Sequence, residues 1–70
     1  MVEPRLHNFY AEIDTETGEC IGVHRSTEII NHPAMVVIPV YDMNYIFKYY
    51  INGNWYEDAE GTIPWTSSLL

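Results

Sequence analysis

The dipeptide Asn52-Gly53 constrains the fold of this chain more than any other feature. It lies between two β-rich runs within "KYYINGNWYED", residues 48–58. A type I′ turn needs a positive φ at both central positions, so Asn-Gly between such runs is typical of a two-residue β-hairpin. The hairpin predicts five facing pairs: Ile51 with Asn54, Tyr50 with Trp55, Tyr49 with Tyr56, Lys48 with Glu57, and Phe47 with Asp58.

Both faces of this hairpin are aromatic, because successive pairs point to opposite sides of a sheet. One face carries Lys48, Tyr50, Trp55 and Glu57, and the other carries Phe47, Tyr49, Ile51 and Tyr56. A core covers only one face, so the second meets solvent, a partner, or residues 61–70 folded back over it. Aromatic surface left uncovered marks an interaction site. The residues expected to contact a partner are Tyr49, Tyr50, Trp55, Tyr56 and Trp65.

A second hairpin is predicted upstream of the first. Residues 8–14 alternate with the period of two of a half-buried strand. Its inward side chains are Phe9, Ala11 and Ile13, and its outward ones are Tyr10, Glu12 and Asp14. A three-residue loop at 16–18, with Gly18 in the left-handed conformation, leads into residues 19–24. The resulting pairs are Thr15 with Glu19, Ile13 with Ile21 and Ala11 with Val23, and Gly22 opposite Glu12 indicates a bulge or a close backbone approach.

One more strand is expected between the hairpins. Residues 35–40, "MVVIPV", are rich in β-branched side chains and too short for a long helix. They predict a strand buried on both faces, with Pro39 at its end. Residues 24–34 precede it as an irregular crossing loop. Residues 41–45 follow it as a turn or a single helical turn capped by Asp42.

The sequence therefore predicts a mainly β fold, a small antiparallel sheet or open barrel-like fold of four to five strands with little or no helix. The strands are expected at about residues 8–14, 19–24, 35–39, 46–51 and 54–58. Residues 1–70 form a single small domain, in which segments 1–7 and 59–70 are candidate flexible or docking tails.

The small size of the domain points to assembly with other chains. A chain of 70 residues buries a modest share of its surface. Domains of this size are usually supplemented by disulfides, a metal or another subunit. The single cysteine, Cys20, cannot form an internal disulfide. We therefore expect a homo-oligomer, or docking onto a larger protein.

The acidic charge excludes one class of partner. Three basic and ten acidic residues give a formal charge of −7, which repels phosphate backbones, so direct nucleic-acid binding is not expected. The same charge suits an inhibitor that imitates nucleic acid and occupies a basic groove of an enzyme. The carboxylates that would carry such binding are Glu12, Asp14, Glu16, Glu19, Glu57, Asp58 and Glu60.

No pattern of catalytic or metal-binding residues is present. Cys20 and His24, four apart on one strand, would share a face at roughly 13 Å, too far for a nucleophile and its base. The histidines, at positions 7, 24 and 32, lack the spacing of metal ligands. We expect no enzyme activity, no metal and no cofactor. A weaker alternative is carbohydrate binding by Tyr50, Trp55 and Glu57, which the predicted hairpin places on one face.

The order of the segments resembles a group of small accessory proteins, and ends of proteins, encoded by tailed phages and prophages of Gram-positive bacteria. The matching motifs are "YAEID" at 10–14, "CIGV" at 20–23, "YD" at 41–42 and "KYYINGNW" at 48–55. The stretches "HPAMVV" at 32–37 and "TIPWTSSLL" at 62–70 depart from the group's pattern.

The resemblance implies a non-enzymatic, tail-associated or virion accessory protein that acts through contacts with a larger phage structural protein. It supplies no catalytic residues. No apolar stretch approaches the roughly 20 residues that span a bilayer, and the first residues do not resemble a signal peptide. The expected location is therefore the virion or the host cytoplasm, with no membrane partner.

Overall fold

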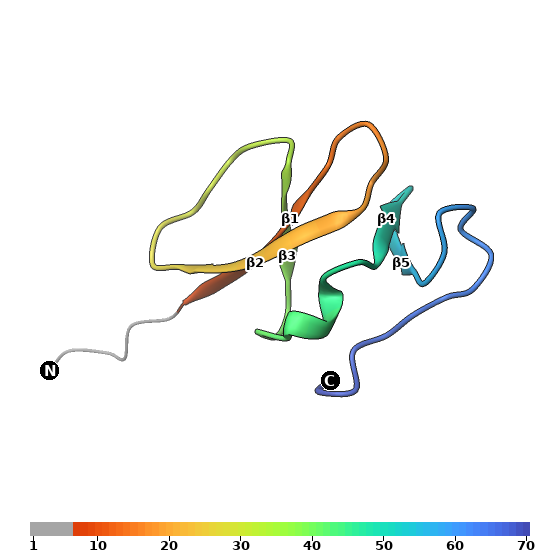
Figure 1. Cartoon of the computed structure of the whole chain (residues 1–70). Coiled ribbons are helices and arrows are strands. Elements are labelled where there is room, and N and C mark those ends of the chain that lie inside the picture. The colour runs from red at the N-terminus through yellow and green to blue at the C-terminus, as the bar shows by residue number, and fades with distance from the viewer. Residues whose placement is uncertain (1–6) are drawn as a thin grey trace, which may run out of the picture.

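The computed structural model describes residues 7–70 and consists of two small antiparallel sheets (Figure 1). The first sheet has the strand order β2-β1-β3, and the second is the β4–β5 hairpin. The elements are β1 (Asn8–Ile13), β2 (Cys20–Ser26), β3 (Met35–Ile38), the 3₁₀ helix η1 (Met43–Tyr45), β4 (Tyr49–Ile51) and β5 (Asn54–Tyr56). The predicted mainly β fold is confirmed. None of the helices in the described part of the chain is long and apolar enough to cross a membrane.

The β1–β2 hairpin has the predicted pairing along most of its length. Ala11 faces Val23 and Glu12 faces Gly22, but Ile13 faces Cys20. The register therefore shifts by one residue, which leaves Ile21 unpaired at a β-bulge. The prediction of a bulge near Gly22 is confirmed, and the predicted pairing of Ile13 with Ile21 is wrong.

The turn of this hairpin is one residue longer than predicted. The Asp14 N–H donates to the Glu19 carbonyl at 2.8 Å, so the loop is residues 15–18. Gly18 has the predicted left-handed conformation, with φ of 82°. The longer loop and the bulge compensate each other, which restores the predicted register from Glu12 onward.

The bulge also changes which β2 side chains share a face. Cys20 and Val23 both lie in the core, although they are three residues apart. His24 points to the opposite face, where its Nε2 lies 2.8 Å from Glu12 Oε1. The prediction that Cys20 and His24 share a face is therefore wrong, since a regular alternation does not continue through a bulge.

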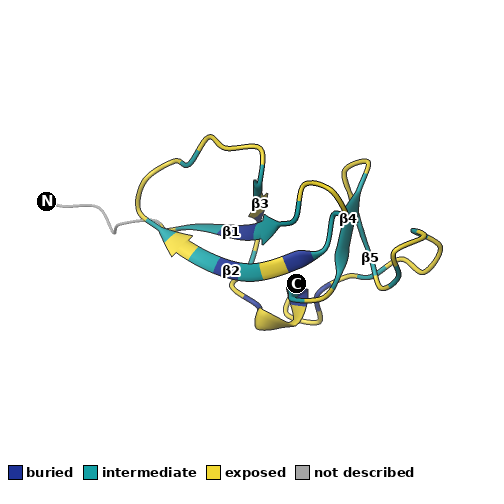
Figure 2. Ribbon diagram, turned by 45° about the horizontal axis from the view of Figure 1, so that its top comes forward, coloured by how far each residue is buried: buried dark blue, intermediate teal, exposed yellow. Residues whose placement is uncertain are grey.

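β1 is the central strand of its sheet and is covered on both faces. Tyr10 was expected to point outward, but only 1% of it is exposed. Its hydroxyl accepts a hydrogen bond from the Ile30 N–H at 2.9 Å and donates to the Glu28 carbonyl at 3.5 Å. Figure 2 shows the loop that follows β2 as mostly exposed, while part of β1 is buried. The irregular 27–34 loop therefore acts as a cover for β1.

β3 is buried on one face only. Ile38 is 2% exposed and packs in the core, whereas Val37 is 69% exposed. The prediction of burial on both faces is wrong, because β3 lies at the outer edge of the sheet and its second face is open. Pro39 follows the strand directly, as predicted.

The β4–β5 hairpin has the predicted turn and inner pairs. Asn52 and Gly53 have φ of 51° and 86°, and Tyr50 faces Trp55 as Tyr49 faces Tyr56. The two outer pairs are not formed. Instead, the Lys48 carbonyl accepts from the Cys20 N–H, and the Phe47 N–H donates to the Cys20 carbonyl. The predicted strand at residues 46–48 is therefore a turn, in which Phe47 has φ of 76°.

Chain segments from elsewhere flank the hairpin on both sides. Glu19 forms a bridge with Tyr49, and Pro64 forms one with Tyr56. The Trp65 N–H donates to the Trp55 carbonyl at 3.0 Å. The chain end then passes back toward η1 (Figure 1). Residues 59–70, a candidate flexible or docking tail in the sequence, thus lie against the domain.

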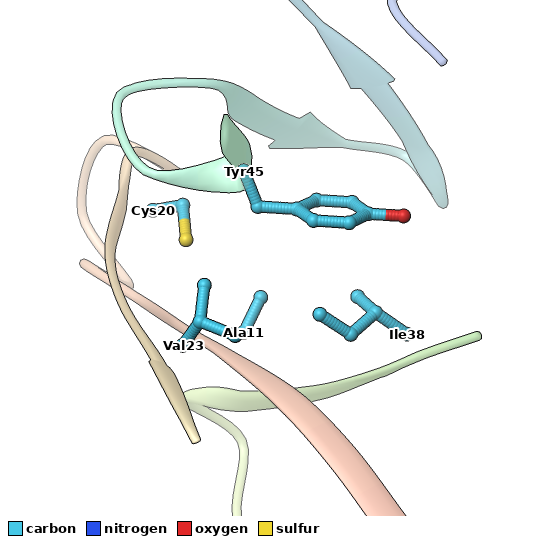
Figure 3. Packing of buried hydrophobic residues seen from close by; sticks show 5 residues of the cluster. All are labelled: Ala11, Cys20, Val23, Ile38 and Tyr45. Carbon is cyan, nitrogen blue, oxygen red and sulfur yellow. The ribbon is translucent and has the colours of Figure 1, made fainter. Parts of the chain in front are cut away.

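The core lies between the two sheets. Its buried members are Ala11, Cys20, Val23, Ile38 and Tyr45. In Figure 3 the Tyr45 ring lies across from Ala11 and Ile38, with its hydroxyl directed away from Cys20. Trp55 and Trp65 pack against this cluster from the second sheet and from the chain end. Tyr45 therefore joins the first sheet to the aromatic residues of the second.

Candidate functional site: an aromatic groove

Two tryptophan side chains from distant segments converge at Tyr45. Its ring centroid lies 4.9 Å from that of Trp55 on β5, with the planes at 71°. It lies 4.8 Å from the ring centroid of Trp65 in the chain end, with the planes at 81°. Edge-to-face contacts of this kind are the arrangement that aromatic pairs favour. Packing therefore holds both indoles at fixed angles around one phenol.

These three side chains line an open groove of about 260 Å³. Pro39 and the polar residues Asn54 and Thr66 also line it. Gly53, Ser67 and Leu70 complete the lining. Among the described residues, no acidic side chain lines this groove. Concave sites with aromatic walls and few polar groups are typical of ligand-binding sites.

The aromatic side chains that line this groove carry three hydrogen-bond donors, of which the Tyr45 hydroxyl can also accept. No side-chain hydrogen bond within residues 7–70 uses the Tyr45 hydroxyl or the indole N–H of Trp55 or Trp65, and every buried polar side-chain atom there has a partner. These three groups must therefore reach solvent. Burial raises the pKa of the Tyr45 phenol, so the hydroxyl keeps its proton at neutral pH. Lys48 adds a full positive charge, with Nζ 5.0 Å from the Trp65 ring centroid.

A buried pair beneath the groove fixes the chain end. Asp42 is 4% exposed and Ser67 is 3% exposed. The Ser67 hydroxyl donates to Asp42, whose other carboxylate oxygen accepts from the Asn44 N–H at 2.9 Å. The predicted capping role of Asp42 is confirmed, whereas its bond to Ser67 was not predicted. This bond ties the segment that carries Trp65 to the start of η1.

Acid is expected to destabilise the protein through two aspartates. The Ser67 hydroxyl lowers the pKa of Asp42, and the Thr62 hydroxyl lowers the pKa of Asp58. A carboxylate with a folded-state pKa below its unfolded value, about 3.9, contributes stability above that value and loses it as the pH falls through the folded pKa. The urea midpoint should therefore fall between about pH 5 and pH 2. Ser67→Ala should reduce the fall of the urea midpoint with pH, and the control Ser68→Ala should not. Equal slopes of the urea midpoint against pH in the two variants would contradict the role of Asp42.

The aromatic residues predicted as a contact surface are divided between two places. Trp55 and Trp65 line the groove, and Tyr50 packs beside Trp55, with ring centroids 5.0 Å apart and planes at 51°. Tyr49 and Tyr56 lie on the other face of the hairpin, where a Cβ on Gly61 would lie 3.7 Å from the Tyr56 ring. All five side chains are half-buried. The chain therefore covers part of both faces itself.

Tyr45, at the centre of the groove, was absent from the sequence-based site. The available signal was its position at the end of a turn capped by Asp42, directly before the aromatic hairpin. The proposed sugar platform gains little support from the geometry. The rings of Tyr50 and Trp55 are tilted by 51° and do not form one flat surface, and Glu57 does not line the groove.

The seven acidic residues of the alternative site do not form one row. Glu12 is bound to His24, while Asp14 accepts from the Glu16 N–H at 2.8 Å and Asp58 accepts from the Ile63 N–H at 2.9 Å. The remaining four lie on two separate turns, at 15–19 and at 57–60. They are Glu16, Glu19, Glu57 and Glu60. Three of the seven carboxylates thus already have partners within the domain.

A second cavity, of about 240 Å³, lies beneath the 27–34 loop. It is lined by Glu12, Ile30, His32, Ala34 and Met35. The Glu12–His24 pair beside it is well exposed, with 38% and 43% of the two side chains open to solvent. Within residues 7–70, no three His, Cys, Asp or Glu side chains are grouped so that they could hold a metal ion. The aromatic groove, with three aromatic side chains in its lining, is therefore the stronger candidate for a protein-binding site.

Comparisons with protein families, with curated proteins and with solved structures find no match to this chain. The functional argument therefore rests on the geometry of the groove and on the chemistry of its residues.

Proposed function

We propose that the protein is a non-enzymatic interaction module that binds a partner protein through the groove of Tyr45, Trp55 and Trp65. The observation that carries this proposal is a set of three hydrogen-bond donors on aromatic side chains, open to solvent and without side-chain hydrogen-bond partners within residues 7–70. Tyr and Trp are enriched in protein interfaces because they bury a large area and keep one polar group.

The resemblance to phage accessory proteins gives this module a biological setting. We infer a tail-associated or virion accessory role, in which the groove docks the domain onto a larger phage structural protein. The location would be the virion or the host cytoplasm. Self-association through exposed apolar side chains, such as Phe47 at 70% and Val37 at 69% exposure, is compatible with the same role. Light scattering at several protein concentrations tests this second mode of assembly.

A peptide selection tests the proposed function without knowledge of the partner. The immobilised protein is panned with random peptides, and the enriched peptides are measured against Thr66→Arg and Thr27→Arg. Thr66 is exposed and lines the groove, while Thr27 is exposed in the loop that follows β2. Both variants gain one positive charge, so only the blocked groove differs between them.

We expect the selected peptides to bind the wild type and Thr27→Arg equally and to lose binding to Thr66→Arg. Circular dichroism shows whether both variants keep the wild-type fold. Peptides that bind all three proteins alike, or a selection that enriches none, would overturn the groove as an interaction site.

The acidic inhibitor remains a second candidate because exposed carboxylates such as Glu16, Glu57 and Glu60 have no side-chain partner among the described residues. Binding carried by these groups would weaken steeply with salt, since exposed charges are screened at a Debye length of about 10 Å in 0.1 M salt. Binding in the aromatic groove should change little. A salt titration of any partner complex therefore separates the two functions.

A further inference from the structure

We infer that the ligand of the aromatic groove is a proline-rich, extended segment of a partner protein. This inference rests on the proposed function and names the chemical class of its ligand. It follows from the charge complementarity between the groove and such a segment, from the shape of the groove walls, and from the absence of acidic side chains in the lining.

The groove presents partial positive charges. Its unpartnered polar groups on aromatic side chains are one O–H and two N–H, and the Lys48 ammonium lies beside Trp65. A segment rich in proline has the opposite character, because each residue offers a backbone carbonyl and proline has no N–H. Donors in the groove can therefore satisfy carbonyls in the ligand without leaving ligand donors unpaired.

The walls suit the same ligand. Proline-rich segments adopt the polyproline II helix, whose backbone has no internal hydrogen bonds, and they dock into aromatic-lined grooves of small domains. The near-perpendicular rings of Tyr45 and Trp55, at 71°, and of Tyr45 and Trp65, at 81°, form the walls on which pyrrolidine rings would pack. The ligand is already extended before it binds, so it loses little conformational entropy.

A carbohydrate fits the groove less well. Sugar hydroxyl groups both donate and accept, so a sugar site needs acceptors as well as donors. Asp42, which is bonded to the groove residue Ser67, is buried and already accepts from Ser67 and Asn44. Among the described residues, the groove therefore offers a sugar no carboxylate, only the neutral oxygens of side chains such as Asn54 and Thr66.

Tryptophan fluorescence gives a direct test, because the chain has two tryptophans and both line the groove. The probes are an end-blocked polyproline peptide of about ten residues, a Gly-Ser peptide of equal length, and a trimer of β-1,4-linked N-acetylglucosamine. We expect a saturable spectral change with polyproline, and none with the Gly-Ser peptide or the sugar.

Two tyrosine variants test the donor argument. Tyr45→Phe removes a hydroxyl that has no partner in the described domain, so it should weaken polyproline binding about three- to tenfold without loss of the fold. Tyr10→Phe removes a hydroxyl that is bonded to Ile30 at 2.9 Å. It should lower the thermal stability and leave the affinity for polyproline unchanged. Thr66→Arg should abolish the spectral change.

Each contrary outcome has a defined meaning. A response to the sugar alone would overturn the proline-rich ligand and leave a binding groove of another class. A response to no probe would overturn the ligand class, while the random-peptide selection decides independently whether the groove binds anything. Polyproline binding that Tyr45→Phe leaves unchanged would overturn the assignment of this hydroxyl as a donor to the ligand.

Discussion

Tyr45→Ala is expected to remove about half of the free energy of unfolding of the protein. Removing a large buried aromatic side chain costs about 3–5 kcal/mol. A domain of 70 residues has a total stability of roughly 4–10 kcal/mol, at 0.05–0.15 kcal/mol per residue. Tyr45 is 3% exposed and contacts both tryptophans, so its loss removes the aromatic contacts that link the core to the hairpin and the chain end.

The measurement is urea unfolding followed by circular dichroism, with Tyr45→Phe as the matched control. Because the hydroxyl has no hydrogen-bond partner among the described residues, Tyr45→Phe should unfold within about 0.5 kcal/mol of the wild type. The comparison thus separates the packing of the ring from the polar role that its hydroxyl has in the groove. A Tyr45→Ala protein as stable as Tyr45→Phe would show that the ring does not hold the core together.

The features that were predictable from the sequence are local ones. Asn52-Gly53 forms its turn because both residues accept positive φ, and Asp42 caps η1 because its side chain reaches an N–H two residues away. The inner register of the β4–β5 hairpin follows from its turn and the alternation of side chains, and the register of the β1–β2 hairpin follows from the alternation only from Glu12 onward. Such signals depend on a few neighbouring residues, so they do not depend on how the rest of the chain folds.

Features that depend on distant segments were not predictable. The burial of Tyr10 depends on the N–H of Ile30, twenty residues further along the chain. In the β1–β2 hairpin, the loop adds one residue and the bulge adds another. The two additions cancel each other beyond Glu12, so the alternation pattern there is the same with both as with neither. Phe47 leaves the predicted strand because its N–H pairs with Cys20 on β2 instead of continuing the hairpin.

The candidate site was half predictable for the same reason. Trp55 and Trp65 stood out as aromatic residues near the hairpin, but a groove requires a third wall. That wall is Tyr45 on η1, to whose start the Ser67–Asp42 bond ties the chain end that carries Trp65. The expected second aromatic face is also partly covered from within the chain, by residues near Gly61. Self-association as the missing source of stability therefore stays a prediction for light scattering.

Gly18→Ala is expected to destabilise the protein by about 3 kcal/mol, and Gly53→Ala by only about 1–2 kcal/mol. Both glycines have a left-handed backbone, with φ of 82° and 86°, so both variants incur the cost of placing an L residue there. They differ in their surroundings. A Cβ on Gly18 would lie 2.8 Å from the Tyr50 carbonyl oxygen, while a Cβ on Gly53 would meet nothing within 4 Å.

The additional cost at Gly18 arises at the junction of the two sheets. The Gly18 carbonyl accepts from the Tyr50 N–H at 2.9 Å, so the backbone movement that relieves the clash also breaks this hydrogen bond. Urea unfolding of the two variants measures the difference. Equal losses would mean that the turn of the first hairpin does not hold β4 in place. A larger loss for Gly18→Ala would show that this contact between backbones, which neither hairpin forms alone, joins the two sheets and keeps Trp55 against Tyr45.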